Sequence, residues 1–428
     1  MKTDGGITSQ VHVAGYTLMR HFPALRQWTR RYYYRLEQWR YQRIANSIAT
    51  DSSVIFFESY LGRNYACSPR AIYEAMLADP RFADCTFVWS FKEGYFPDVS
   101  DADSPLAQAA LVQRGTQAYY EALAVAGTIV LNARLPEYVV PKPDQVFVQC
   151  WHGTPLKRLG YDVQVETTNV MNTTAELAAR FGLDAQKWTY LLSPSPYTSL
   201  HLADAFGVSK ERRANVVLEV GYPRNDELVL KRDDEAARDA ARVALGVPAG
   251  KKVMLYAPTW RDDHYTDGLG YSMDVLVDFN ELQGKLGSDW VVLFRAHYYI
   301  ANSFDFAALD GFVIDVSKAG DINQLYLASD VLVTDYSSVM FDYANLHRPI
   351  VLSCPDIDEY AGATRGFYFD INQVPGPLCL TTDELAGALQ KLDTYQEDYG
   401  AEYDAFCEQF CPLDDGHASE RVLDVLAG

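Results

Sequence analysis

Short apolar runs rich in β-branched and aromatic residues alternate with helical patterns through most of this 428-residue chain. Such alternation is typical of a parallel sheet covered by helices on both faces. Strands are expected at 54–59, 86–90, 128–132, 146–151, 190–193 and 216–220, and again at 252–257, 290–295, 312–315, 331–334 and 349–353. A charged helical stretch at 233–245 separates the two series. The pattern predicts an α/β fold with two Rossmann-like domains facing a cleft.

The break between the two series sets the expected domain boundaries: a basic segment at 1–50, a first domain at 51–230 and a second at 231–428. The formal net charge is −20, but residues 1–50 hold eight Lys/Arg against two acidic residues, so they carry +6 and the rest of the chain −26. An acidic body argues against nucleic acid as a partner. The basic head and the acidic body therefore have different partners.

Seven cysteines are scattered without a disulfide or metal spacing, which favours a reduced, cytoplasmic compartment. No segment approaches the roughly 18 consecutive apolar residues of a membrane span, and the N-terminus lacks the apolar core of a secretory signal. We expect a protein that is neither exported nor integral to the membrane.

Residues 24–44 form a helical pattern with an aromatic and apolar stripe. The stripe consists of Leu25, Trp28, Tyr32, Leu36 and Trp39, and the arginines around it are Arg26, Arg30, Arg31, Arg35 and Arg40. Aromatic rings with guanidinium neighbours suit an anionic membrane surface, where each Lys or Arg contributes about 1 kcal/mol. The alternative is a helix that docks on the acidic body. We interpret the segment as a peripheral anchor on the inner face of the cell membrane.

The stretch 329–354 shows a strand, a turn and a helix in immediate succession. The run Val331–Thr334 suits a buried strand, and Ser337 and Ser338 follow it at the start of a helical pattern. A helix N-terminus at the carboxyl edge of a sheet offers N–H groups and a positive dipole end to a phosphate. Asp342 lies one turn beyond Ser338, within reach of a ribose or polyol hydroxyl. An ordinary capped helix is the alternative interpretation.

Other candidate groups also follow expected strands. His152 comes directly after one strand and precedes a Gly-Thr-Pro turn and the basic pair Lys157-Arg158, which favours an anion-facing loop over a structural histidine. Arg295-Ala296-His297 ends a strand of the second series. Arg224 follows Gly221-Tyr222-Pro223, and Thr259 and Trp260 follow the strand at 252–257. Several cationic groups at one sheet edge indicate a diphosphate site.

Six blocks of this sequence stand in the order seen in the CDP-glycerol glycerophosphotransferase family of teichoic acid primases and polymerases, which the chain resembles over roughly residues 50–400. The blocks are Trp151-His152-Gly153-Thr154-Pro155-Leu156-Lys157, Gly221-Tyr222-Pro223-Arg224-Asn225-Asp226, Ala257-Pro258-Thr259-Trp260-Arg261-Asp262, Arg295-Ala296-His297, Thr334-Asp335-Tyr336-Ser337-Ser338 with Asp342, and Arg365-Gly366-Phe367-Tyr368. Many relatives carry a methionine where Ala296 stands, and the head is short, so the choice between primase and polymerase stays open.

The resemblance implies a GT-B fold and transfer of glycerol phosphate, or ribitol phosphate, from a CDP-alditol to a lipid-linked acceptor with release of CMP. It implies that the first domain takes the acceptor, with His152 as general base and the backbone of Gly153, Thr154, Pro155 and Leu156 lining the reaction centre. It implies that His297 steadies the donor diphosphate. The implied donor contacts are Arg224, Thr259, Trp260, Arg295, Ala296, Ser337, Ser338 and Asp342.

The chemistry is reasonable for these residue types. A neutral imidazole with a pKa of about 6.5 can deprotonate an alditol hydroxyl, which accelerates such reactions by roughly 10²–10⁴-fold. No Asp-x-Asp pair ends an expected strand, and Asp262-Asp263 follows Arg261, so we expect neither an obligate metal nor another cofactor. Two other functions fit the pattern: a GT-B enzyme that uses a UDP- or GDP-sugar, and a catalytically inactive membrane scaffold.

Overall fold

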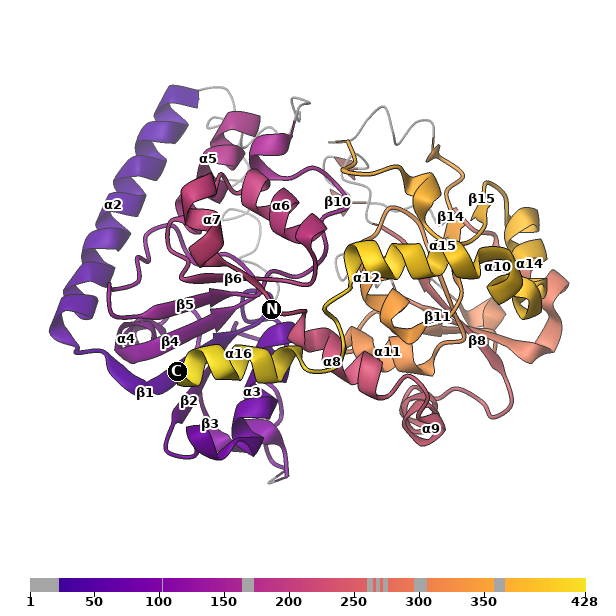
Figure 1. The fold of residues 1–428 in the computed structure, drawn as a ribbon, viewed down its shortest axis with the longest axis horizontal. Coiled ribbons are helices and arrows are strands. Elements are labelled where there is room, and N and C mark those ends of the chain that lie inside the picture. The colour runs from indigo at the N-terminus through magenta and orange to yellow at the C-terminus, as the bar shows by residue number, and fades with distance from the viewer. Residues whose placement is uncertain are drawn as a thin grey trace, which may run out of the picture.

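The computed structural model describes residues 23–101, 103–163, 173–259, 265–266, 270–271, 276–295, 306–357 and 366–428. Two lobes lie side by side in Figure 1, the first drawn mostly in indigo to magenta and the second mostly in salmon to yellow. Each lobe is built on one parallel sheet. A separate two-stranded antiparallel ribbon consists of β9 (Tyr265–Thr266) and β10 (Gly270–Tyr271).

The first sheet has seven strands in the order β3-β2-β1-β4-β5-β6-β7. Their bounds are β1 Asp51–Glu58, β2 Thr86–Phe91, β3 Ala109–Gln113, β4 Ala126–Leu131, β5 Val146–Gln149, β6 Tyr190–Ser193 and β7 Val217–Glu219. Each pairs in parallel with its neighbours, as the alternating sequence pattern requires. Within this sheet, β3 is the one described strand that was not expected from the sequence; β15 of the second sheet (Leu378–Cys379) was also not expected. Strand β3 lies at the edge of the sheet, where its side chains are partly exposed.

Helices cover both faces of the first sheet, and the alternation of side chains along β1 shows why. Val54 and Phe56 join the core beneath α4 (Gln117–Val125) and α6 (Pro196–Ala205), while Ile55 and Phe57 join the core beneath α3 (Cys67–Ala78). The remaining helices of this lobe are α2 Pro23–Ser47, α5 Thr174–Ala185 and α7 Lys210–Val216. Both faces are therefore buried, which accounts for the nearly continuous apolar runs of the strands.

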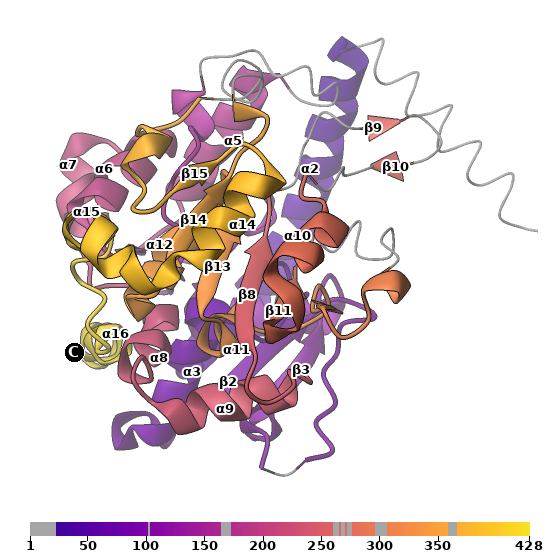
Figure 2. The same ribbon diagram turned by 90° about the vertical axis from the view of Figure 1, so that its right-hand side faces the viewer.

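The second sheet has six strands in the order β12-β11-β8-β13-β14-β15. Their bounds are β8 Lys252–Ala257, β11 Trp290–Phe294, β12 Val313–Asp315, β13 Val331–Thr334, β14 Ile350–Ser353 and β15 Leu378–Cys379. Along β8, Met254 packs under α10 (Phe279–Leu286) and α14 (Thr382–Gln390), and Leu255 packs on the opposite face. Figure 2 shows α10 and α14 in front of these strands.

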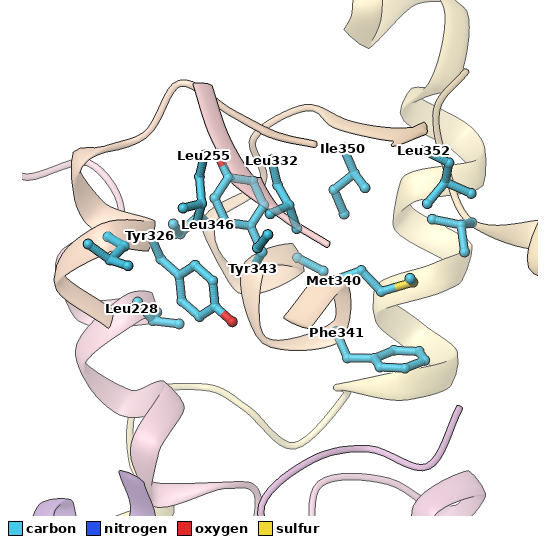
Figure 3. Packing of buried hydrophobic residues seen from close by; sticks show 14 of the residues in the cluster. Leu228, Leu255, Tyr326, Leu332, Met340, Phe341, Tyr343, Leu346, Ile350 and Leu352 are labelled. Atoms are coloured by element: carbon cyan, nitrogen blue, oxygen red, sulfur yellow. The ribbon is translucent and has the colours of Figure 1, made fainter. Parts of the chain in front are cut away.

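The opposite face of the second sheet carries the largest core of the molecule. Helices α9 (Glu235–Ala244), α11 (Ile322–Ala328), α12 (Val339–Tyr343) and α15 (Tyr395–Phe410) contribute to it. In Figure 3, Tyr343 of α12 points toward Leu332 of the sheet, whereas Phe341 points away from the sheet, where its ring lies 5.4 Å from that of Phe406 on α15. Packing on this core holds a helix of only five residues in place directly after β13.

The chain crosses between the lobes twice. The first crossing is α8 (Pro223–Leu230), and the second joins α15 to α16 (Ala418–Ala427). Helix α16 lies in the range expected for the second domain, yet Val422 and Leu423 pack with Ile72 and Met76 of α3 in the first lobe. The two Rossmann-like lobes confirm the expected GT-B architecture.

Candidate active site

A cavity of about 410 Å³ lies between the two lobes, at the carboxyl ends of their strands. Its lining includes nine of the residues singled out from the sequence: His152, Gly153, Thr154, Pro155, Leu156, Thr259, Arg295, Ser337 and Ser338. Trp260, Ala296 and His297, together with Asp262 and Asp263, lie outside the described residues. A cavity of similar volume at the far edge of the first sheet offers only Arg81 as a cation, and Arg81 already pairs with Asp79 and Asp424. The cavity between the lobes is therefore the candidate active site.

His152 is aimed into this cavity by a tight turn after β5. Trp151 has a positive φ of 48°, and its N–H donates to Gln149 Oε1 at 3.0 Å. The Nδ1 atom of His152 lies 2.8 Å from the main-chain oxygen of Asn132. A carbonyl oxygen can only accept, so Nδ1 carries the proton and the neutral ring keeps its lone pair on Nε2. The tautomer is the one that a general base requires.

Asn132 joins three loops at this edge of the sheet. Its main-chain oxygen accepts from His152, and its Oδ1 atom accepts from the N–H of Tyr60 at 2.7 Å. Tyr60 has a positive φ of 49°, and its ring centroid lies 6.2 Å from that of His152. The sequence interpretation gave Asn132 no role. A polar residue directly after the apolar strand β4 was the signal that could have identified it.

The environment of His152 favours the neutral base. The ring is exposed to the cleft, but protein atoms of both lobes crowd around it and limit its hydration. This desolvation lowers the pKa of His152, and the positive charges of Arg224 and Arg134 act in the same direction. The hydrogen bond to Asn132 raises the pKa, with an effect smaller than that of desolvation but larger than that of either arginine. The ring therefore stays unprotonated at neutral pH.

The second lobe supplies the opposite wall. Ser337 and Ser338 follow β13, and Ser338 faces Gly153 across the cleft. Asp335 accepts a hydrogen bond from the N–H of Thr259 at 2.7 Å, which ties the loop after β8 to the loop after β13. Arg295 donates to the main-chain oxygen of Ala319 at 3.1 Å, and burial lowers its pKa. This wall offers hydroxyl groups and a guanidinium to a ligand.

Arg224 and Asp342 lie beneath the cavity rather than in its lining. The guanidinium of Arg224 donates to both oxygens of Asp342, at 3.2, 3.1 and 2.8 Å, and both residues are buried. The pair joins α8 to α12, so it connects the two lobes at the base of the cleft. Direct contact of these two side chains with a donor stays a prediction.

Asp414 extends this network to the second crossing of the chain. It accepts from the N–H of Tyr222 at 2.7 Å, from Asn225 Nδ2 at 2.6 Å and from Asn345 Nδ2 at 3.2 Å. Burial raises the pKa of Asp414 to about 7, although these donors act in the opposite direction. Both crossings of the chain therefore meet in one buried polar cluster.

The outer rim of the cleft is closed by a second contact between the lobes. Lys157 and Phe367 form an antiparallel bridge, and Arg158 N–H donates to Gly366 O at 3.0 Å. Tyr368 N–H donates to the main-chain oxygen of Leu156 at 2.9 Å, and the side chain of Leu156 joins the core of the second lobe. The segment after His152 is thus held by both lobes.

The expected basic helix is present as α2, and it docks on the first lobe. Tyr41 and Ala45 are buried there, and Tyr41 packs against Tyr120 of α4 with ring centroids 6.2 Å apart. No helix in the described part of the chain is both long and apolar enough to cross a membrane.

The other face of α2 points outward. Trp28, Tyr32 and Trp39 are 64%, 62% and 53% exposed. Arg43 lies over the ring of Trp39 at 4.9 Å. One side of α2 therefore packs on the first lobe, and the opposite side exposes aromatic rings.

Comparison with known proteins gives consistent matches. A family model described as CDP-Glycerol:Poly(glycerophosphate) glycerophosphotransferase matches residues 40–428. The teichoic acid poly(glycerol phosphate) polymerase of Staphylococcus epidermidis is 40% identical over 373 residues, covering 87% of this chain but 50% of that protein, so this chain spans about half its length. The teichoic acid glycerol-phosphate transferase of Staphylococcus aureus is 36% identical over 378 residues, 88% of this chain and 93% of that protein. The solved structure of the wall teichoic acid polymerase TagF has 39% identity and a TM-score of 0.80, over 88% of this chain and 88% of that chain.

Proposed function

This chain belongs to the CDP-glycerol:poly(glycerophosphate) glycerophosphotransferase family, and on that premise we propose that it transfers glycerol phosphate, or ribitol phosphate, from a CDP-alditol to a lipid-linked acceptor. Relatives are named as glycerol-phosphate and ribitol-phosphate enzymes, and one TagF crystal was soaked with CDPG. The observation that supports the proposal best is the fixed tautomer of His152, whose Nε2 lone pair is free at the cleft. The product would belong to teichoic acid or a related cell-surface polymer.

In the proposed reaction, the acceptor hydroxyl oxygen attacks the phosphorus that carries the alditol. His152 Nε2 takes the hydroxyl proton, a phosphodiester forms, and the bond from that phosphorus to the oxygen of CMP breaks. Negative charge develops on the transferred phosphoryl group and on CMP. Arg295, Ser337 and Ser338 line the facing wall and would stabilise this charge. His297 would assist at the diphosphate.

The two lobes divide the substrates in this proposal. The first, within 51–230, would receive the acceptor at His152 and the turn that follows it. The second, within 231–428, would hold the donor through Thr259, Trp260, Arg295, Ala296, Ser337 and Ser338, with Arg224 and Asp342 beneath. No metal or other cofactor is needed in this scheme.

We infer that α2 rests on an anionic membrane surface at the inner face of the cell membrane. Its exposed aromatic residues lie opposite the docked Tyr41 and Ala45, so the helix can stay packed on the body while Trp28, Tyr32 and Trp39 enter the headgroup region. A lipid-linked acceptor would then reach the first lobe from the surface on which the enzyme sits.

The test is to incubate the full chain with CDP-glycerol or CDP-ribitol and a short lipid-linked acceptor, and to measure CMP release and product mass. We expect growth by one or more alditol phosphate units. His152→Ala should lower the rate by roughly 10²–10⁴-fold while donor affinity stays unchanged. His417→Ala is the matched control, because His417 is exposed and pairs with Glu420. Hexose transfer from a UDP-sugar, or full activity of His152→Ala, would overturn the proposal.

A further inference from the structure

In the part of the chain that the structure describes, the guanidinium of Arg134 forms no hydrogen bond or ion pair, and its charge acts on the proposed base His152. Arg134 lies two residues beyond Asn132, in the loop after β4 at the carboxyl edge of the first sheet. Its guanidinium carbon lies 4.8 Å from the ring centroid of Phe181. Arg180 and Arg213 in the same lobe pair with Glu137 and Asp204. Arg134 therefore differs from these arginines in having no directly bonded carboxylate among the described residues.

The surroundings of Arg134 disfavour a solitary positive charge. Burial lowers the pKa of Arg134, and the positive charge of Arg180 acts in the same direction. Asp184 and Glu137 act in the opposite direction, but neither carboxylate forms a hydrogen bond or ion pair with Arg134 among the described residues. A partly buried cation without a directly bonded anion is costly, and an anionic ligand would remove that cost. A guanidinium stacked on an aromatic ring keeps its N–H donors free in the ring plane, where they suit the paired oxygens of a phosphate group.

A short series of aromatic contacts connects Arg134 with the base. The Phe181 ring meets the Trp151 ring edge-on at 6.2 Å, and the Trp151 ring lies 4.2 Å from that of His152. Arg134 is also one of the charges that lower the pKa of His152. The guanidinium thus belongs to the first lobe, is separated from His152 by two aromatic rings, and is close enough for its charge to act on that ring.

The other neighbour of Arg134 is the basic helix. The phenol of Tyr34 on α2 is among the groups that act on the charge of Arg134. Near its N-terminal end, α2 meets α5, which carries Phe181, through a hydrogen bond from Gln27 Nε2 to Glu176 Oε1 at 3.0 Å. Arg134 therefore lies between the helix with the exposed aromatic face and His152.

We propose that Arg134 binds the phosphodiester of the acceptor that is closest to the attacking hydroxyl. This inference rests on the proposed function and specifies its acceptor. In a glycerol phosphate chain three carbon atoms separate the terminal hydroxyl from the preceding phosphodiester, so a hydroxyl at His152 brings that anion toward the first-lobe wall. The enzyme then recognises acceptors whose growing end is already an alditol phosphate.

The test compares two acceptors that differ in one group. One ends in glycerol phosphate, and the other replaces that phosphodiester by an uncharged methylphosphonate diester. Arg134→Ala should raise KM for the charged acceptor by roughly 10- to 100-fold, because it removes hydrogen bonds to a charged group. KM for the uncharged acceptor and KM for CDP-glycerol should stay unchanged. Arg134→Lys should raise KM for the charged acceptor by less than Arg134→Ala does, and should leave KM for the uncharged acceptor unchanged.

Arg213→Ala is the matched control, since it removes the same charge from the same lobe at a paired arginine. An equal loss with both acceptors, or no loss in Arg134→Ala, would overturn the inference. The inference would also be overturned if Arg134→Ala bound acceptor-free anionic vesicles more weakly than wild type by the same factor, because Arg134 would then bind a lipid headgroup. If Arg134→Ala has a lower Tm than wild type, KM for the charged and the uncharged acceptor is compared in Arg134→Lys instead. Absence of CMP release by the wild-type chain would instead refute the proposed function itself.

Discussion

Gly153 and Ser338 touch across the cleft so closely that a Cβ atom on Gly153 would lie 2.8 Å from Ser338 Oγ. Gly153 follows the proposed base, and Ser338 begins the helix after β13. The reacting edges of the two lobes are therefore in contact in this arrangement. Small side chains at both positions are what permit it.

We first predict that Gly153→Ala impairs catalysis by forcing these two edges apart. Gly153 does not have a positive φ, so alanine is compatible with its backbone, and the effect should be steric. The measurement is kcat and KM for CDP-glycerol. Adding Ser338→Gly should restore part of the loss. Failure of the second substitution to help would show that the contact does not limit closure.

The second prediction concerns the pH dependence of the rate. A base acts when unprotonated, and the pKa of His152 is lowered below the ordinary histidine value of 6.5. Activity should therefore persist as the pH falls to 6.5 and decline only below it, when Nε2 takes a proton. A pH profile of kcat/KM tests this. An acid limb centred above 6.5 would contradict the assigned base.

Third, Asp342→Ala should destabilise the fold by about 3–5 kcal/mol, because it leaves the buried guanidinium of Arg224 without its carboxylate. Replacing both residues, with Arg224→Met and Asp342→Leu, should cost less than the single change. Urea unfolding followed by fluorescence gives both values. Equal stability of Asp342→Ala and wild type would show that the ion pair adds nothing to the connection between the lobes.

Fourth, stability should fall as the pH rises through about 7, since that is the folded-state pKa of Asp414, raised from 3.8. The protonated carboxyl is favoured in the fold, so its contribution is complete below 3.8 and is lost above 7. Asp414→Asn should flatten this part of the Tm profile. A profile with the same slope in the variant would assign the titration to another group.

The fifth prediction separates the two faces of α2. Replacing Trp28, Tyr32 and Trp39 together by serine should reduce binding to anionic vesicles and leave Tm unchanged, because these rings are exposed. Tyr41→Ala should do the reverse, since Tyr41 is buried against the first lobe. Binding of wild type should also weaken with salt. Unchanged vesicle binding in the triple variant would refute the membrane interpretation.

Much of the fold could be predicted because its strands are buried on both faces. Strands β6, β8 and β13 have the same bounds as the apolar runs from which they were predicted. The edge strand β3 escaped because its side chains are only partly buried, so its sequence has no distinct apolar run. Helix α15 was not predicted, because many polar side chains obscure the pattern of its few buried aromatic residues, such as Tyr403 and Phe406, which pack it on the second lobe.

The sequence predicted those residues of the candidate site that directly follow a strand, because the strand end determines where they lie. Polar residues directly after strands do converge, as with His152 and Ser338. Asp342 shows the limit, because helix phase indicated its face but not that Arg224, 118 residues earlier in the chain, would occupy its carboxylate. The hydrogen bond of His152 Nδ1 could not be predicted from the sequence either, since its acceptor is a main-chain oxygen, which every residue type has.

The packing of α16 on α3 has a consequence for synthesis. Val422 and Leu423 complete a core whose other members come from residues 55–220. The first lobe therefore cannot finish its interior until residues 418–427 have been made, and the second lobe must form in between. Until then part of the apolar surface of α3 stays uncovered on the nascent chain, and exposed apolar surface of this kind favours aggregation.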